Sequence, residues 1–390
     1  MTTQELTDQY IAGTYARLPV TFVRGAGSLL WDADGKEYID LGSGIAVNGL
    51  GLADAGWADA VAAQLRQIAH ASNLYYTQPQ AQLAKALCER TGMQKVFFAN
   101  SGAEANECMI KCARKYAADR WGENTRPGVI ALKNSFHGRT LATLAATGQE
   151  AFHHDFGPFP TGFYFAEANN IQDLARVLAE NEGRCCALLL EPVQGEGGVV
   201  PLTQEYVQQA AALVKSREML LLFDEVQTGN GRTGTLFAFE QYGVQPDLLS
   251  TAKGLAGGLP LGACLFGETT KDTLGAGSHG STFGGNPACA AGALYTLSRI
   301  DDALLAEVRA KGARIRQRLE GAPGIQSVTG LGLMLGLQTV RPAKEVLADC
   351  LHQGVVVLTA KEKVRLLPAL NIPTDVLERA LDVICQVAAG

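Results

Sequence analysis

The sequence has little charge, and its basic residues are not concentrated. Only 18% of the 390 residues are charged, the formal net charge is -6, and no block of Lys and Arg occurs. Binding to nucleic acid requires a basic face that neutralises phosphates. We therefore expect no nucleic-acid partner.

Long apolar runs are also absent. No stretch approaches the roughly 18 apolar residues of a membrane-spanning helix. The first twenty residues, MTTQELTDQYIAGTYARLPV, lack the cationic start and apolar centre of a secretory signal. We expect a cytoplasmic protein without membrane contact.

Cysteine is present, but not in the spacings of zinc or redox sites. None of the nine cysteines belongs to a C-x-x-C pair, and several lie inside apolar runs, as reduced core thiols do. The run His153-His154-Asp155 could suggest a metal or a catalytic relay, but no further ligand follows at metal-binding spacing. A solvated loop is the favoured interpretation, and we expect no metal.

Short apolar runs typical of strands alternate with helical patterns through the middle of the chain. This alternation predicts an α/β fold with a mostly parallel sheet and helices on both faces. A helix is expected at 102–121. The expected strands are 95–100, 128–134, 185–193, 219–226, 248–254 and 263–267.

The carboxyl third predicts a smaller α+β domain. Helices are expected at 287–299, 302–319 and 374–388, with short strands after Gly324. Near the amino terminus, Asp34-Gly35 between apolar flanks predicts a hairpin that could pair with this domain and make it discontinuous. The expected division is an amino-terminal segment of the small domain at 1–55, a large cofactor-binding domain at 56–288 and the small domain at 289–390.

An acidic pair follows one of the buried strands. In MLLLFDEVQTG, five apolar residues lead directly to Asp224 and Glu225. Ligands of open α/β sheets bind beyond the carboxyl ends of the strands, so either acid is a candidate to meet a cationic group. Alternatively, the strand simply ends and the acids are solvated.

Two further motifs follow strands. In FFANSGAEAN, the helix start at Ser101-Gly102-Ala103 offers free N–H groups to a phosphate, although Ser101 and Glu104 could equally form a capping box. The loop KNSFHGRT brings an aromatic ring, Phe136, and a carboxylate-binding side chain, Arg139, to the same edge. It could also be a surface turn.

A glycine motif and a lysine complete the set. GNGRTG, at 229–234, fits G-x-G-x-x-G, but no acid occurs at 248–267 as a dinucleotide site requires, so we reject that interpretation. In STAKGLAGGLPLG, Lys253 ends an apolar strand. Partial burial there would depress its pKa and make it a nucleophile for carbonyls, whereas the alternative is a core-edge lysine that reaches solvent.

These features converge on one ligand, which needs a phosphate, an aromatic ring, a ring cation for Asp224 and an aldehyde for Lys253. Pyridoxal phosphate (PLP) has all four groups. Asp224 would hold the ring nitrogen protonated, and Glu225 is then expected to be structural.

Over nearly its whole length the sequence resembles the class III, fold type I aminotransferases, and among them the acetylornithine aminotransferases most. The resemblance rests on NSGAEAN, FHGRT, EPVQGEGG, DEVQTGNGRTG, TAKGLAGGLPLG and HGSTFGGNP in the family's order. It implies an enzyme that transfers the terminal amino group of N-acetylornithine to 2-oxoglutarate in arginine biosynthesis. Ornithine, succinylornithine and 4-aminobutyrate aminotransferases are the alternatives, and a non-catalytic binding or regulatory relative is the alternative from another class.

The resemblance also implies roles in cofactor binding. Phe136 and Val226 would pack on the two faces of the ring, Asp224 would pair with its nitrogen, Gln227 would lie near its hydroxyl and Lys253 would form the Schiff base.

The phosphate would be bound by Ser101, Gly102 and Ala103. Thr282 would reach the phosphate held by the neighbouring subunit, which implies a homodimer with shared active sites.

Substrate contacts are implied for four more residues. Arg139 would bind the α-carboxylate, with Ser281 nearby from the partner chain. Arg365 would bind a carboxylate of 2-oxoglutarate, and Glu196 would pair with Arg365 when an amine donor occupies the site.

The sequence departs from the family pattern in two places. GLGLADAGWADA, at 49–60, stands where a turn containing His-Pro is usual, and Ala103 stands where Thr is common. Loss of the Thr hydroxyl removes at most one hydrogen bond, worth roughly 1–2 kcal/mol, and leaves the backbone donors.

Overall fold

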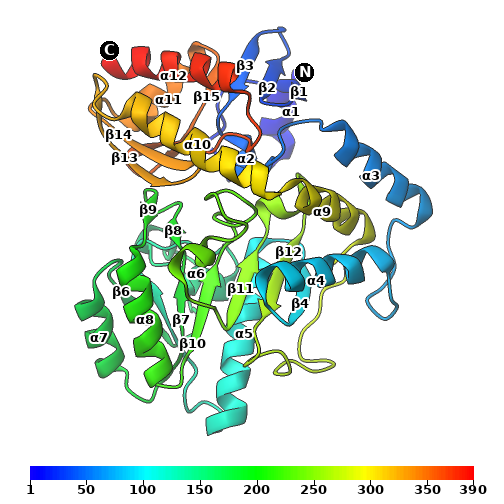
Figure 1. Ribbon diagram of the computed structural model, residues 1–390, viewed down its shortest axis with the longest axis vertical. Helices are drawn as coiled ribbons and strands as arrows, with labels where there is room; N and C mark the ends of the chain where they lie inside the picture. The colour runs from blue at the N-terminus through cyan, green and yellow to red at the C-terminus, as the bar shows by residue number, and fades with distance from the viewer.

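The computed structural model describes residues 1–390 and has two parts. In Figure 1 the lower part is built on a large sheet, and the upper part holds both chain termini. The amino-terminal strands lie beside the carboxyl-terminal helices in this upper part, so segments from opposite ends of the chain share one unit.

The large part is centred on a seven-stranded sheet in which only β12 runs against its neighbours. In spatial order the strands are β4 (Lys95–Ala99), β12 (Gly262–Phe266), β11 (Leu248–Thr251), β10 (Leu220–Asp224), β7 (Cys185–Leu190), β5 (Gly128–Leu132) and β6 (Phe163–Ala166). Its helices are α3 (Ala55–Gln67), α4 (Gln78–Thr91), α5 (Gly102–Trp121), α6 (Leu141–Ala146), α7 (Ile171–Glu180), α8 (Gln204–Ser216) and α9 (Pro287–Arg299). The predicted strands and the predicted helix at 102–121 are confirmed.

Both faces of this sheet are buried, because alternate residues of each strand point to opposite sides. On β10, Leu220 and Leu222 pack in a cluster with Met109 of α5. Leu221 and Phe223 point to the other face, into the main core that α7 and α8 complete. This arrangement explains why β10 reads as an unbroken apolar run rather than an alternating one.

The small part combines two four-stranded sheets with three helices. The β2–β3 hairpin runs through Asp34-Gly35 as predicted, and β3 pairs in parallel with β15. One sheet contains β1 (Phe22–Ala26), β2 (Leu29–Asp32), β3 (Glu37–Asp40) and β15 (Val355–Val356). The other contains β13 (Ile325–Leu331), β14 (Met334–Thr339), β17 (Lys363–Leu366) and β16 (Leu358–Ala360). The helices are α10 (Asp302–Leu319), α11 (Ala343–His352) and α12 (Thr374–Ala389).

Short elements connect these parts or lie at their edges. They are α1 (Thr3–Tyr10), α2 (Ser43–Ala46), η1 (Glu150–Phe152), β8 (Val193–Gln194), β9 (Val200–Pro201), η2 (Ala238–Tyr242) and η3 (Lys253–Ala256). The division at 1–55, 56–288 and 289–390 stays a prediction, and its last boundary would assign most of α9, a helix that packs with the large part, to the small domain. The boundary at 288/289 falls within the first turn of α9, a helix that packs on α3 and α4.

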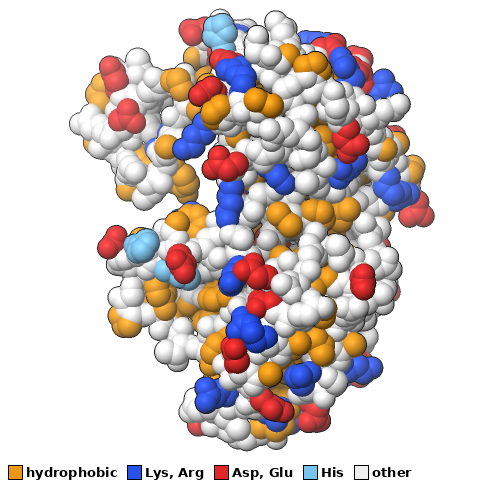
Figure 2. Space-filling view, turned by 90° about the vertical axis from the view of Figure 1, so that its left-hand side faces the viewer, with side chains coloured by type: hydrophobic (Ala, Val, Ile, Leu, Met, Phe, Trp, Pro, Cys, Tyr) orange, Lys and Arg blue, Asp and Glu red, His pale blue; other side chains and the backbone are white.

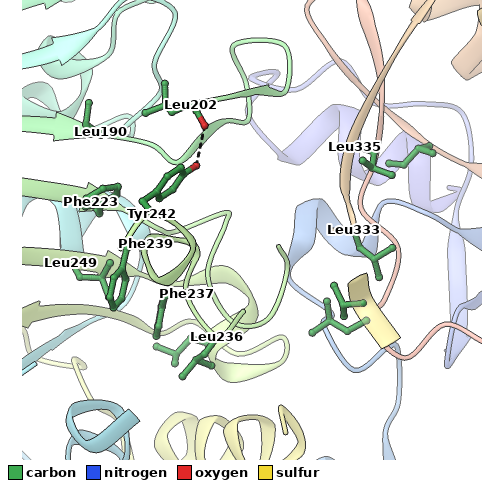
Figure 3. Close-up of a cluster of buried hydrophobic side chains, with 14 of the residues drawn as sticks. Leu190, Leu202, Phe223, Leu236, Phe237, Phe239, Tyr242, Leu249, Leu333 and Leu335 are labelled. Carbon is green, nitrogen blue, oxygen red and sulfur yellow. Dashed lines mark hydrogen bonds between the residues drawn. The ribbon is translucent and has the colours of Figure 1, made fainter. Parts of the chain in front are cut away.

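The GNGRTG motif lies at the joint between the two parts and is buried. The Arg232 guanidinium donates to the carbonyls of Leu333 and Pro368 in the small part, and the Leu333 N–H donates back to the Arg232 carbonyl at 2.9 Å. Figure 3 shows Leu333 and Leu335 across from the aromatic cluster of η2. The motif therefore joins the two parts and offers no open turn for a nucleotide, in agreement with the sequence interpretation.

The surface in view carries mixed charge, and the cysteines form no disulfides. On the face drawn in Figure 2, acidic and basic side chains are interspersed. No helix combines the length and apolarity needed to cross a bilayer, no group of three His, Cys, Asp or Glu side chains is arranged to hold a metal ion, and all nine cysteines are free thiols.

Candidate active site

A cavity of about 450 Å³ lies where the carboxyl ends of the parallel strands meet. Its wall includes residues that follow β4, β5, β7, β10 and β11, which is the edge where open α/β sheets bind ligands. Nine of the thirteen predicted site residues line it: Ser101, Gly102, Ala103, Phe136, Arg139, Asp224, Val226, Gln227 and Lys253.

The start of α5 forms one end of the cavity. Ser101 is the N-cap and its hydroxyl accepts from the Glu104 N–H at 3.2 Å, while the Glu104 carboxylate accepts from the Asn100 N–H at 2.6 Å. Gly102 and Ala103 are the first two helical residues, so their N–H groups have no acceptor within the helix. These free donors and the positive end of the helix dipole suit an anion.

Only glycine fits at position 102. A Cβ there would lie 2.6 Å from the Cγ1 of Val226, which is closer than real side chains approach. The contact brings the helix start and the turn after β10 together on the same cavity, and Val226 lines that cavity.

Asp224 is buried at the end of β10 and held by three donors. Its Oδ2 accepts from Asn106 Nδ2 at 2.7 Å and from His137 Nδ1 at 2.8 Å, and its Oδ1 accepts from the Val226 N–H at 3.0 Å. His137 must carry its proton on Nδ1 to make this bond. The carboxylate is thus fixed in orientation on the wall of the cavity.

Asn106 was not singled out from the sequence, although it belongs to NSGAEAN. Its amide donates to Asp224 and to the His137 carbonyl, both at 2.7 Å, and its Oδ1 accepts from the Ser250 hydroxyl at 2.6 Å. The available signal was a polar residue at a buried position of α5, one turn after Gly102. The sequence does not show which group such an amide serves.

Glu225 is turned away from the cavity, as expected for a structural residue. Its carboxylate accepts from the N–H groups of Ala238 and Phe239, both at 2.7 Å, and from the Thr228 hydroxyl at 2.9 Å. It therefore anchors the start of η2.

Lys253 faces the cavity from a strained turn. It follows β11 and opens η3 with a backbone φ of 45°, a left-handed value that a side chain rarely adopts. Burial lowers the pKa of its amine, and the nearby Arg365 cation acts in the same direction, against the opposing effects of Glu196 and Asp224. A lysine with a lowered pKa is suited to nucleophilic and proton-transfer chemistry.

Glu191 is a second residue without a role assigned from the sequence. It follows β7, lines the cavity and accepts from the Phe136 N–H at 2.9 Å and the Gly195 N–H at 3.3 Å. Burial raises the pKa of this carboxyl. It ties the loop that carries Phe136 to the loop that carries Glu196.

Arg365 and Glu196 form an ion pair next to the cavity, although neither lines it. Arg365 Nη1 lies 2.6 Å from Glu196 Oε1 and 3.1 Å from Gln227 Oε1, and Gln227 is a lining residue. Burial opposes ionisation of Glu196, but the Arg365 cation outweighs it and holds the pKa of Glu196 below its usual value. The Arg365 Nε has no partner, so this buried cation keeps a free donor.

Ser281 and Thr282 lie outside the cavity. Ser281 Oγ accepts from Asn100 Nδ2 at 3.2 Å, and Asn100 is a lining residue. Thr282 is exposed on the neighbouring turn. Their roles toward a partner subunit therefore stay predictions.

The residues present fit PLP. Free N–H groups at the start of α5 suit its phosphate, Phe136 and Val226 offer apolar contact to a ring, Asp224 suits a ring cation and Lys253 suits an aldehyde. The His137 Nε2 is buried without a partner, which leaves one further polar atom available at the site.

Comparison with known proteins gives the family. The pattern described as "Aminotransferase class-III" matches residues 10–388. This protein is a class-III aminotransferase. The family confirms the expectations of an enzyme, of the aminotransferase fold and of PLP as the cofactor.

Individual relatives extend this result. The chain is 49% identical to the acetylornithine aminotransferase of Haemophilus ducreyi, with 98% of each chain covered. It is 43% identical to the succinylornithine transaminase of Salmonella enteritidis, with 97% of this chain and 95% of the relative covered. A solved ornithine aminotransferase from Toxoplasma gondii, with partial occupancy of PLP at its active site, superposes with a TM-score of 0.93 at 29% identity and covers 99% of this chain and 93% of its own.

Proposed function

We propose that this aminotransferase transfers the terminal amino group of N-acetyl-L-ornithine to 2-oxoglutarate, giving N-acetylglutamate semialdehyde and glutamate in arginine biosynthesis. The observation that carries the proposal is the 49% identity with an acetylornithine aminotransferase over nearly the full length of both chains. The site supports it with two arginines, Arg139 on the cavity and Arg365 beside it.

The cofactor, when bound, supplies an electron sink for the carbon that carries the amine. Asp224 would bind the ring nitrogen in its protonated form, and the three donors that fix the carboxylate support this role. The Lys253 Nζ, whose pKa burial lowers, would take the proton from the substrate carbon and hold it for transfer within the site.

The two arginines divide the recognition of carboxylates. Arg139 would bind the α-carboxylate of the donor. Arg365 would bind a carboxylate of 2-oxoglutarate after Glu196 moves away, and Glu196 would neutralise Arg365 while the donor, which has no second carboxylate, occupies the site.

Succinylornithine is the second candidate donor, because the 43% identity with a succinylornithine transaminase covers as much of the chain. Ornithine and 4-aminobutyrate remain alternatives within the family. The non-catalytic alternative has lost its support, because Lys253 and Asp224 both line the cavity of a protein in an enzyme family.

We also propose a homodimer, and a cytoplasmic location. Two loops expose large apolar side chains: Tyr76 is fully exposed, Leu74 is 87% exposed and Phe283 is 59% exposed. The Asn73 side chain joins the loops by donating to the carbonyls of Ser281 and Gly284. A patch of this kind next to Thr282 supports a partner subunit there, and sedimentation of the active enzyme as a monomer would exclude it.

The deciding experiment is a half-reaction of the PLP-loaded enzyme without any keto acid. The visible absorbance of the lysine-bound cofactor should convert to that of the amine form with N-acetylornithine, faster than with succinylornithine, ornithine or 4-aminobutyrate. Lys253→Ala is the matched control and should not turn over. Absence of conversion with N-acetylornithine would reject this donor, and turnover by Lys253→Ala would reject the role of the lysine.

A further inference from the structure

The guanidinium of Arg139 lies at the cavity without a carboxylate or hydrogen-bond partner, and aromatic rings support it instead. Its Cζ lies 4.2 Å from the ring centroid of Phe152 and 5.5 Å from that of Phe136. An arginine held in this way keeps its donors free for a ligand. The shorter of the two distances belongs to Phe152, a residue with no assigned role.

Phe152 is itself held in place from several directions. Its ring meets Phe136 edge to face at 5.9 Å. Its N–H donates to the Gln149 carbonyl at 3.1 Å, and the Gln149 side chain donates to the Ser135 carbonyl at 3.1 Å. The short helix η1 is therefore hydrogen-bonded to the loop that carries Arg139, and this places the Phe152 ring beside the guanidinium.

The two rings have different tasks. Phe136 lines the cavity, where a cofactor ring would occupy its face. Phe152 does not line the cavity, so its face stays available to the cation when cofactor and substrate are bound.

We propose that Phe152 is a positioning residue: it holds the Arg139 guanidinium in the orientation that binds the α-carboxylate of the amine donor, and so makes the site selective for donors that carry this group. The inference rests on the proposed function, because it assigns a substrate group to Arg139. Loss of the ring leaves Arg139 charged but free to move, so its contact with the carboxylate weakens while the chemistry at the amine carbon is unaffected.

The test compares two donors that differ only in the α-carboxylate, N-acetylornithine and N-acetylputrescine, in steady-state turnover of the holoenzyme with saturating 2-oxoglutarate. Phe152→Leu keeps an apolar side chain of similar size and removes the aromatic face. It should raise the KM for N-acetylornithine about five- to thirty-fold, leave kcat within about two-fold and leave kcat/KM for N-acetylputrescine unchanged. Phe152→Tyr, which keeps the ring, should restore the wild-type KM.

A double variant separates positioning from a general structural effect. In the Arg139→Gln background, Phe152→Leu should add no further loss, because the group that it positions is gone. Equal losses with both donors, additive losses in the double variant, or no effect of Phe152→Leu would each overturn the proposal. If the wild-type enzyme does not use N-acetylornithine, the proposed function fails, and the same comparison with ornithine and putrescine decides the role of Phe152 separately.

Discussion

The hairpin that carries Glu196 is fastened by a buried tyrosine. The Tyr242 hydroxyl lies 3.0 Å from the Pro192 carbonyl and 3.3 Å from the Leu202 carbonyl, on the two sides of the hairpin, and Figure 3 shows the bond to Leu202. The Leu202 N–H also donates to the Pro192 carbonyl at 2.9 Å. Tyr242→Phe removes only the hydroxyl, so it tests how much this fastening contributes.

The expected cost follows from what remains paired. The Pro192 carbonyl keeps the Leu202 N–H as a donor, whereas the Leu202 carbonyl loses the tyrosine. Loss of this bond leaves the buried Leu202 carbonyl without its donor, which predicts a decrease of about 1–2 kcal/mol in the free energy of unfolding. The bond joins η2 to the hairpin. The expected change in the free energy of unfolding is therefore the same whichever amine donor the enzyme uses.

The chain offers a matched control in Tyr206. Both tyrosines are 3% exposed, but the Tyr206 hydroxyl has no hydrogen-bond partner. Tyr206→Phe removes an unpaired polar atom and should change the free energy of unfolding by less than about 0.5 kcal/mol, or increase it. The assay is urea unfolding of the holoenzyme at a fixed excess of PLP, because cofactor binding itself shifts the midpoint.

The comparison has a clear refuting result. If both variants lose the same free energy, the loss comes from packing around the ring and not from the hydroxyl. If Tyr206→Phe is the more destabilising of the two, the account of which hydroxyl is paired is wrong.

Three further perturbations have defined outcomes. Arg365→Ala should raise the KM for 2-oxoglutarate about ten- to a hundred-fold in steady-state turnover, since charge-assisted hydrogen bonds are lost. An equal rise in the KM for the amine donor would contradict its role. Burial raises the pKa of Glu225 from its ordinary 4.5 to about 7, so between these values the folded protein holds a proton that the unfolded chain releases, and this group's contribution to stability falls as the pH rises. Glu225→Gln lacks this titrating group. As the pH rises through this window, the free energy of unfolding of the variant should therefore rise relative to that of the wild-type protein, by up to roughly 3 kcal/mol. Urea-unfolding free energies of the two proteins that change in parallel with pH would contradict the assignment. Trp57→Phe loses the hydrogen bond to the Ala256 carbonyl and should lower the free energy of unfolding by about 1 kcal/mol in the urea assay, and an unchanged midpoint would show that this bond contributes nothing.

The sequence could predict what depends on neighbours in the chain. The run that leads to Asp224 predicts a buried strand because its apolar residues are consecutive, and the glycines and lysine after β11 predict a turn at the edge of the sheet. Parallel strands bring their carboxyl ends to one edge, so the residue order alone places Ser101, Phe136, Asp224 and Lys253 near one another.

Contacts between distant segments could not be predicted in the same way. Asn106, Asp224 and Ser250 form one hydrogen-bonded group although they come from three elements. The antiparallel direction of β12 could not be predicted from the sequence either, because an apolar run has the same pattern in both directions. Glu191 reads as a strand-end acid, and only the fold shows that it joins the loops of Phe136 and Gly195.

The segment at 49–60, which departs from the family pattern, makes one contact of this long-range kind. Trp57 lies in the first turn of α3, after the N-cap Asp54, and its indole Nε1 donates to the Ala256 carbonyl at 3.0 Å. Ala256 ends η3, the turn that Lys253 opens with a left-handed backbone. Such a conformation persists only where surrounding contacts hold it. A segment that lacks the usual His-Pro turn therefore contributes a hydrogen bond to the far end of the turn that Lys253 opens.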